Sequence, residues 1–346
     1  MNTLGLDIGG ASIKAASSKG WASSIRFPLW RTPDLLAKAL TTLCQPVGFD
    51  RIVLTMTGEL CDAFETKEEG VRRILNSAAE AFGKRTPLHV WQTTGRFCGV
   101  KQACESPWET GAANWLALAT FAGQLADCPR AILIDIGSTT TDIIPIRDGA
   151  PVPIGRTDPD RLTSRELVYH GVRRTPVSSI LERITLDGID YPLMRELFAT
   201  SLDAFLLTAE IPENANESDT ADNRPETARF AIDRLARMIG SDRTRFTKQN
   251  AEHLAEKIRT AQLDDLKEGL LAVKRAVSFD DIDVAITSGE GEFLARRLLR
   301  ETESLKALKV ISLAELLTPA TSRAACAYAV AKLADEMLGV AIPKWQ

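Results

Sequence analysis

The sequence predicts an α/β protein of two domains, and three observations support this prediction. The chain has 346 residues, which is too long for one comfortable hydrophobic core and right for two. Short apolar strand patterns alternate with helical patterns along most of its length. A hydrophobic strand that runs into Asp-Ile-Gly occurs at Asp7 and again at Asp135, 128 residues later. We therefore expect two related units rather than one large domain.

Residues 1–129 are predicted to form the first domain. Gly9 and Gly10 close its first strand, and Pro33 lies near the start of its first helix. The predicted strands cover residues 4–8, 12–17, 21–29, 51–55 and 88–91. The predicted helices cover residues 33–44, 67–82 and 107–126.

Residues 130–318 are predicted to form the second domain. Its predicted strands cover residues 132–136, 141–146, 152–154, 283–287 and 309–313. Its predicted helices cover residues 226–239, 247–276 and 292–300. Residues 212–225 have no bulky apolar side chain, so we expect a solvated, mobile loop there, with a substrate lid as the alternative. Residues 319–346 are predicted to contain a closing helix that can pack back on the first domain.

The composition excludes several classes of protein. Hydrophobic residues make up 45% of the chain and charged residues 25%, as in ordinary globular proteins. The formal net charge of −4 gives no basic excess, so we expect neither nucleic acid nor a membrane as partner. The longest uncharged stretch has 17 residues, which is shorter than a membrane span, and no export signal is visible. Six cysteines without a framework spacing suggest reduced thiols, so a cytoplasmic location is expected.

The repeated hairpin carries the most chemical information. In each copy a strand presents an aspartate, Asp7 or Asp135, and a glycine turn brings backbone N–H groups close to an anion. Small hydroxyl residues add donors. The predicted phosphate-binding residues of the two turns are Gly9, Gly10, Ser12, Gly137, Ser138, Thr139 and Thr140. Two such hairpins face to face would suit a magnesium-bound phosphate or diphosphate, whereas one alone would be an ordinary turn.

These paired hairpins resemble the phosphate-binding loops of the actin, heat-shock chaperone and sugar kinase superfold. The second loop, residues 135–142, is especially similar to the hydantoinase/oxoprolinase family. Four further segments resemble its subfamily linked to tetrahydromethanopterin-dependent one-carbon metabolism. These segments are residues 55–60, 111–115, 166–176 and 288–294. The resemblance implies two ribonuclease-H-like domains with mixed sheets flanked by helices and an active site in the cleft between the domains.

The resemblance also implies an enzyme activity. It points to a transferase of methanofuran-type cofactor biosynthesis, which joins an aminomethylfuran methyl diphosphate to the phenol of a γ-glutamyl tyramine or tyrosine acceptor and releases diphosphate. Small diphosphate and phenolic molecules are then the expected partners, and Asp7 and Asp135 are the expected Mg²⁺ ligands and catalytic residues. The sequence leaves open which phenol is used and the oligomeric state, with a homodimer as one option.

Two other function classes stay open at this stage. One is an ATP-dependent kinase or an amide hydrolase of the hydantoinase/oxoprolinase kind, and the other is a non-catalytic, nucleotide-gated interaction protein. Gly289, Glu290 and Gly291 lie where nucleotide-using members of the superfold usually carry a Gly-Gly pair at the adenosine. A carboxylate there would repel a nucleotide unless it points away, so ATP is disfavoured as a cofactor and these three residues are assigned to substrate.

The remaining candidates each have a structural alternative. Glu59 is predicted to be the base that accepts the phenolic proton, with helix capping as the alternative. Thr57 and Asn114 are predicted to bind substrate, Thr57 from a sheet-end loop and Asn114 from a buried helix, where an amide needs polar partners. Lys14 occupies the position in the first repeat that Asp142 occupies in the second, and it would neutralise phosphate or else point to solvent.

Arginines between the second hairpin and the mobile loop are the last candidates. Arg173 and Arg174 are predicted to bind phosphate oxygens, and Arg156 and Arg161 belong to the same cluster. Guanidinium groups suit the oxygens of a diphosphate because they can donate two parallel hydrogen bonds. A surface network of ion pairs is the alternative for this cluster.

Overall fold

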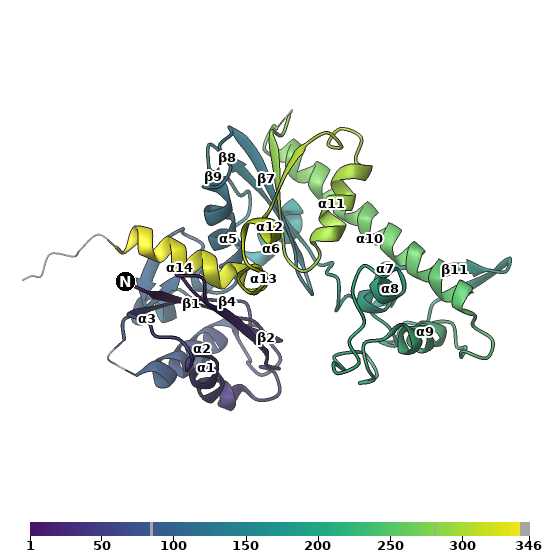
Figure 1. Ribbon diagram of the computed structural model, residues 1–346, viewed down its shortest axis with the longest axis horizontal. Coiled ribbons are helices and arrows are strands. Elements are labelled where there is room, and N and C mark those ends of the chain that lie inside the picture. The colour runs from purple at the N-terminus through teal and green to yellow at the C-terminus, as the bar shows by residue number, and fades with distance from the viewer. Residues whose placement is uncertain (84–85, 280, 340–346) are drawn as a thin grey trace, which may run out of the picture.

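The structure is a computed structural model that describes residues 1–83, 86–279 and 281–339. It contains two mixed sheets, each with helices against it, and a helical lobe inserted into the second domain (Figure 1). The predicted fold class, two domains with mixed sheets flanked by helices, is therefore confirmed. No helix among the described residues combines the length and the apolar composition of a membrane span.

The sheet of the first domain has the strand order β3-β2-β1-β4-β5-β6. Its strands are β1 (Thr3–Ile8), β2 (Ser12–Ser17), β3 (Ala22–Arg26), β4 (Arg51–Met56), β5 (Leu88–Trp91) and β6 (Phe97–Gly99). β1 pairs antiparallel with β2 and parallel with β4. Every residue of β1 and β4 is buried, as in central strands that are covered on both faces. The helices of this domain are η1 (Pro33–Leu35), α1 (Leu36–Cys44), α2 (Lys67–Phe82), α3 (Val100–Glu105) and α4 (Pro107–Thr110).

The sheet of the second domain has the order β10-β8-β7-β13-β14, with β9 added to β8. Its strands are β7 (Arg130–Ile136), β8 (Thr141–Arg147), β9 (Ala150–Pro151), β10 (Leu167–Val168), β13 (Val284–Ser288) and β14 (Lys309–Ser312). β7 pairs antiparallel with β8 and parallel with β13, which repeats the pairing of β1. The strand predicted at 152–154 is wrong in position, because β9 precedes it.

Two helices lie between the sheets and join the domains. α5 (Asn114–Gly123) and α14 (Ala325–Met337) pack on each other, and α14 also packs on β1, β2 and β4 (Figure 1). Val53 and Trp91 of the first domain share one buried cluster with Leu133 and Ile144 of the second domain. α14 approaches β1 so closely that a Cβ on Gly5 would overlap the carbonyl group of Ala327.

Two predicted helices are broken in the structure. The helix predicted at 107–126 is wrong, because α4 ends at Thr110 and α5 begins at Asn114. Ala112, in the segment between them, has a positive φ of 52°. The helix predicted within 319–346 is split into α13 (Pro319–Arg323) and α14 at Ala324, whose backbone is not helical. Residues 340–346 of that prediction lie outside the described residues.

A helical lobe is inserted between β10 and β13. For this stretch the sequence analysis predicted the loop 212–225 and the helices 226–239 and 247–276, but none of the elements before residue 212. The lobe comprises α7 (Val177–Ile180), β11 (Arg183–Leu186), β12 (Ile189–Pro192), α8 (Ser201–Leu207), α9 (Ala228–Arg237) and the first half of α10 (Lys248–Ala276). Leu254 and Ile258 of α10 belong to the core of this lobe, whereas Leu266 and Leu270 pack against the second sheet. α10 therefore ties the lobe to the second domain. The other helices of this domain are α6 (Asp158–Ser164), α11 (Glu292–Glu301) and α12 (Leu313–Leu316).

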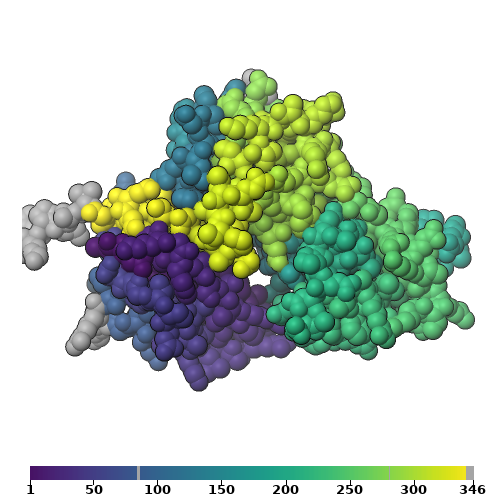
Figure 2. Space-filling view, viewed as in Figure 1, coloured from purple at the N-terminus to yellow at the C-terminus, as the bar shows by residue number. Residues whose placement is uncertain are grey.

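The loop at 212–225 contacts both the inserted lobe and the first domain. Asp222 forms ion pairs with Arg234 and Arg237 of α9, and Asp219 pairs with Arg26 at the end of β3 in the first domain. Figure 2 shows the lobe, in teal and green, against the first domain, in purple. Charged side chains rather than apolar ones hold this segment, and its mobility stays a prediction.

Candidate active site

The two repeated hairpins have the same backbone construction. Asp7 pairs with Lys14 across β1 and β2, and Asp135 pairs with Asp142 across β7 and β8. The turns are closed by equivalent hydrogen bonds, from Gly9 N to Ser12 O at 3.0 Å and from Gly137 N to Thr140 O at 2.8 Å. Every one of these positions is offset by the same 128 residues. The repeat in the sequence is therefore a repeat in structure.

Strand alternation directs both aspartates toward the interface between the domains. In β1 the residues Leu4, Leu6 and Ile8 belong to the core under α1 and α2, so Asp7 lies on the opposite face, where α14 packs. In β7 Ile134 and Ile136 belong to the core under α10 and α11, so Asp135 lies on the face that carries the shared cluster. The two carboxylates thus lie on the sheet faces that meet at α5 and α14.

The space around these carboxylates contains buried polar atoms that no described residue satisfies. They are Oδ1 of Asp7 and Oγ1 of Thr55, whereas the hydroxyl of Ser288 interacts with the Asp135 carboxylate and lowers its pKa. Thr55 lies beside Asp7 on β4, and Ser288 lies beside Asp135 on β13. Buried polar atoms normally have a hydrogen-bond partner, so this cluster indicates a place for water, an ion or substrate oxygens. The sequence analysis missed both hydroxyl residues, although their place at the end of the adjoining parallel strand is shared by the two domains.

Charge interactions also bring the two hairpins together. Burial raises the pKa of Asp7, and the nearby Lys14 opposes that shift. Burial and the charge of Asp142 raise the pKa of Asp135 to about 6. Burial lowers the pKa of Lys14, but carboxylates of both domains, first that of Asp7 and also those of Asp135 and Glu290, shift it upward overall. Lys14 is half-buried, and it lies on the same sheet face as Asp7 because Ile13 and Ala15 point into the core on the other face. Its charge interacts with both aspartates.

Glu59 lies in a buried ion pair next to the first hairpin. Its Oε1 is 3.4 Å from Nζ of Lys67, while its Oε2 has no partner among the described residues. Burial raises the pKa of Glu59 and Lys67 opposes the shift. Gly111 closes over this pair, because a Cβ there would lie 2.5 Å from the Glu59 carboxylate. The capping alternative is wrong, since Thr66 caps α2. The role of Glu59 as a base stays a prediction.

Thr57 and its counterpart loop hold the hairpins in place. Thr57 is exposed, and its N–H donates to Ile8 O at 2.9 Å. The next residue, Gly58, also donates to Ile8 O, at 3.1 Å, and the equivalent bond in the second domain runs from Gly291 N to Ile136 O at 2.8 Å. Gly289 has a positive φ of 88°, and a Cβ on it would lie 2.7 Å from Oδ1 of Asp135. Of the predicted substrate residues 289–291, Gly289 thus lies against the second carboxylate.

Arg173 and Glu290 neutralise each other. Nε of Arg173 is 2.6 Å from the Glu290 carboxylate, and its NH1 is 2.9 Å from that of Glu226, which is buried. Arg173 therefore reduces the expected repulsion between Glu290 and a nucleotide, but its single charge is shared by two carboxylates. The guanidinium of Arg174 lies 5.1 Å from the ring centroid of Trp30 in the first domain, an arrangement that is favourable for a cation and an aromatic ring.

Asn114 lies at the interdomain site together with Cys326. Nδ2 of Asn114, at the start of α5, is 3.8 Å from Sγ of Cys326, at the start of α14. Burial raises the pKa of Cys326 well above its usual value, and the charges of Asp7 and Asp135 raise it further. The thiol therefore stays protonated beside both carboxylates. The sequence alone could not predict that Cys326 lies beside the two aspartates, because α14 and β1 are separated by most of the chain.

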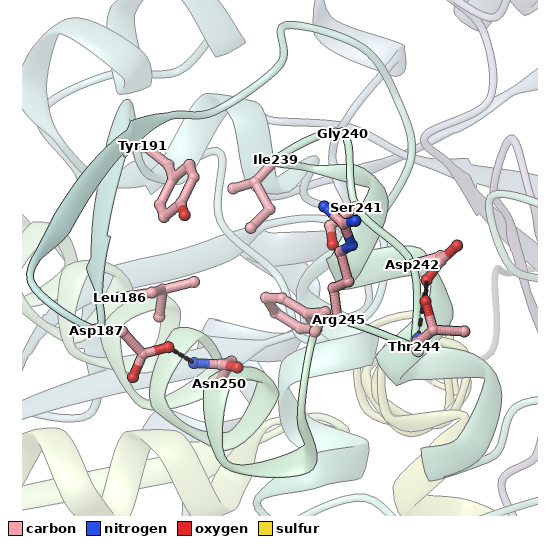
Figure 3. A pocket seen from close by; sticks show the side chains of 11 residues that line it. Leu186, Asp187, Tyr191, Ile239, Gly240, Ser241, Asp242, Thr244, Arg245 and Asn250 are labelled. Carbon is pink, nitrogen blue, oxygen red and sulfur yellow. Dashed lines mark hydrogen bonds between the residues drawn. The ribbon is translucent and has the colours of Figure 1, made fainter.

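A cavity in the inserted lobe is separate from these residues (Figure 3). It has a volume of about 540 Å³ and is lined by side chains from 186–191 and 239–250. Tyr191 and Ile239 line its wall, and Asp187 is hydrogen-bonded to Asn250. This cavity contains none of the residues that the sequence predicted for the site.

The fold and the site define a class of protein. The protein has two mixed sheets, and each contributes one carboxylate hairpin to a shared interface. This is the fold expected from the resemblance to actin, heat-shock chaperones and sugar kinases. The structure is similar to nucleotide-free acetone carboxylase, from work on ATP-dependent acetone carboxylation, with a TM-score of 0.51 and 16% identity. That match covers 88% of this chain and 46% of the other, and at this identity it shows the fold alone.

The chain belongs to the hydantoinase/oxoprolinase family, whose sequence profile matches residues 50–337. A curated relative from Methanocaldococcus jannaschii is named (4-{4-[2-(gamma-L-glutamylamino)ethyl]phenoxymethyl}furan-2-yl)methanamine synthase. It is 33% identical over 338 residues, which cover 97% of this chain and 98% of the relative. A relative of the same name from Methanococcus vannielii is 30% identical over 197 residues, which cover 57% of this chain and 86% of that protein.

Proposed function

We propose that this protein is a cytoplasmic aryl-ether synthase of methanofuran-type cofactor biosynthesis. Its substrates would be an aminomethylfuran methyl diphosphate and the phenol of a γ-glutamyl tyramine or tyrosine. The near full-length similarity to a synthase whose name describes that phenoxymethylfuran product supports this proposal. The observation in the structure that carries it is the pair of carboxylate hairpins with unpartnered buried oxygens between the domains.

The reaction requires one bond to form and one to break. The phenolate oxygen forms a bond with the furfuryl carbon, and the bond from that carbon to the diphosphate oxygen breaks, so that diphosphate leaves with the electron pair. The furan ring stabilises positive charge at that carbon, so no protein nucleophile is needed. The phenolic proton passes to a base, for which Glu59 is the candidate. Its Oε2 has no partner, and burial raises the pKa of this carboxyl, which makes it a stronger base.

The residues of the chain would bind the leaving group and align the reactants. N–H groups of the two glycine turns and the ammonium of Lys14 would stabilise charge on the departing diphosphate. The Asn114 amide at the start of α5 would contact the substrate from the other side. A site buried between two domains keeps water away from the reacting carbon.

The two aspartates fit a magnesium ion that is shared with the substrate. No cluster of three His, Cys, Asp or Glu side chains in the described parts of the chain can hold a metal alone. Mg²⁺ commonly uses one or two carboxylates together with phosphate oxygens and waters, and the unpartnered Oδ1 of Asp7 suits that arrangement. Bound there, the ion would neutralise charge on the diphosphate. ATP is not expected as a cofactor, because the diphosphate substrate already carries its leaving group.

The proposal is tested by synthesis of the ether. Purified protein with Mg²⁺, the furan diphosphate and γ-glutamyltyramine or γ-glutamyltyrosine should release diphosphate and yield the aryl ether, which mass spectrometry detects. Omission of the phenol is the control, since diphosphate release should then fall to the rate of slow hydrolysis. Protein that makes no ether with either acceptor, yet hydrolyses ATP steadily, would show that the hydrolase or kinase alternative is correct.

A further inference from the structure

The second hairpin carries two like charges on neighbouring strands. Asp135 and Asp142 are directly opposite each other, and both lie on the face toward the interdomain interface. Like charges directly opposite in a sheet destabilise it, and a second carboxylate beside Asp135 would also repel a diphosphate. The first hairpin avoids this problem, because Lys14 occupies the equivalent position.

Arg161 of α6 compensates the second of these charges. Its guanidinium forms a close ion pair with Asp142 and lies 3.5 Å from Asp158 through NH1. Arg161 is only 1% exposed, and its guanidinium carbon lies 4.1 Å from the ring centroid of Trp115 in α5. The side chain is enclosed and both terminal nitrogens have carboxylate partners, whereas Nε has no partner among the described residues. It therefore differs from Arg173 and Arg174, which are partly or fully exposed.

The surroundings of Arg161 extend its contacts to both domains. Trp115 belongs to the cluster that the two sheets share. The charge of Asp158 raises the pKa of the buried Glu59, and the charge of Lys67 lowers the pKa of Asp158. Asp158 of α6 therefore interacts with the ion pair of the first domain. Burial of an arginine carries a large desolvation cost, which is offset only by good partners. Here those partners place one positive charge beside the second hairpin.

We propose that Arg161 is a positioning residue that sets the charge of the second hairpin, so that the interdomain site accepts a diphosphate next to Asp135. This inference rests on the proposed function, which places the diphosphate there. Arg161 acts through Asp142 and makes no contact with the ligand. Removal of Arg161 leaves Asp142 as an uncompensated buried charge. Removal of both charges restores the net charge of the site, and the partly exposed Asp158 loses Arg161 equally in both variants.

The test is a double-mutant cycle on anion binding. Calorimetry with inorganic pyrophosphate and Mg²⁺ compares the wild type, Arg161→Met, Asp142→Asn and the double variant that carries both changes. We expect Arg161→Met to weaken binding at least tenfold and the double variant to bind within about threefold of the wild type. Arg161→Lys, which keeps the charge, should lose less than Arg161→Met. Arg165→Met is the matched control, because Arg165 pairs with Asp265 of α10 and should leave the affinity unchanged.

The possible outcomes separate the inference from the proposed function. A double variant that binds as weakly as Arg161→Met overturns the inference, because Arg161 then acts through its packing on Trp115. A double variant that does not fold overturns it for the same reason. If Arg161→Met alone fails to fold, the double variant still decides the question. Equal binding by the wild type and Arg161→Met overturns the inference alone, whereas a wild type that binds no pyrophosphate overturns the diphosphate site as well.

Discussion

In the first domain the residue across the hairpin from the aspartate is Lys14, whereas in the second domain it is Asp142. The strands, turns and closing hydrogen bonds are otherwise equivalent. The first hairpin therefore supplies its own positive charge to the interdomain site. The second supplies two carboxylates, one of which is compensated from α6 by Arg161. A repeated backbone can thus carry two different charge patterns.

The loops that follow β4 and β13 also differ between the two domains, in how closely they pack against the hairpins. Gly58 after β4 and Gly289 after β13 both pack against their own hairpin. A Cβ on Gly58 would meet Leu29 Cδ2 at 2.7 Å and the backbone of Gly9 and Gly10 at 3.0 and 3.2 Å. A Cβ on Gly289 would lie 2.3 Å from the carbonyl oxygen of Ile136 and 2.7 Å from the carboxylate of Asp135. Both loops therefore pack against backbone of their own hairpin, and the second loop approaches that backbone more closely.

The largest effect should come from the aspartates themselves. Asp7→Asn and Asp135→Asn should each lower the turnover of ether synthesis roughly 10²-fold or more, the scale of one lost electrostatic contact in the transition state. Steady-state kinetics of diphosphate release measures this. Asp127→Asn is the control, since Asp127 is exposed. If only one variant is impaired, a single hairpin carries the chemistry. If both retain full activity, the site lies elsewhere.

Alanine substitutions at Gly289 and Gly58 should lower the free energy of unfolding by different amounts. We expect Gly289→Ala to lower the free energy of unfolding by about 2–3 kcal/mol, because the new Cβ meets backbone at a positive φ. Gly58→Ala should cost less, about 1 kcal/mol, because its backbone contacts are longer and its φ is not positive. Urea unfolding measures both. Gly188→Ala, at a positive φ with open space around it, isolates the conformational cost. Equal losses at Gly58 and Gly289 would contradict the closer approach of the second loop to its hairpin backbone.

Removal of the charge on Lys14 should weaken ligand binding more than it affects stability. Lys14→Met should reduce the affinity for Mg²⁺-pyrophosphate about tenfold, the effect of one lost charge-assisted contact. The unfolding free energy should change little, because loss of the attraction to Asp7 is offset by a smaller desolvation cost. Lys19→Met, at the exposed turn after β2, is the matched control. Unchanged affinity would mean that the turn amides alone bind the anion.

Local patterns were enough to predict the two hairpins, because a hydrophobic strand, a glycine turn and a return strand form from neighbouring residues. The break before α5 could not be predicted in this way. Gly111 and Ala112 adopt a non-helical backbone where the chain closes over the ion pair of Glu59 and Lys67, which lie far away in sequence. The place of Cys326 likewise depends on the packing of α14 against β1. Tertiary contacts, rather than local preference, decide these features.

The smallest expected effect is a difference in the acid titration of the two domains. In the second domain Asp265 of α10 accepts from His170 and pairs with Arg165. The hydrogen bond from His170, together with Arg165, lowers the pKa of Asp265 to about 2 against the opposing effect of burial. In the first domain burial raises the pKa of Glu59 instead. The two carboxylates therefore contribute to stability with opposite signs.

Because the pKa of Asp265 is lower in the folded state than in the unfolded one, its stabilisation is complete above about pH 4 and is lost as the pH falls toward 2. Solvent screening at this partly exposed pair reduces the expected gain to about 1 kcal/mol. Asp265→Asn should therefore lower the unfolding free energy at pH 6 and have less effect at pH 3, as measured by urea unfolding at both values. Asp264→Asn, at the exposed neighbouring position, is the control and should change neither. A loss that is the same at both pH values would mean that Asp265 acts through packing of α10 rather than through its charge.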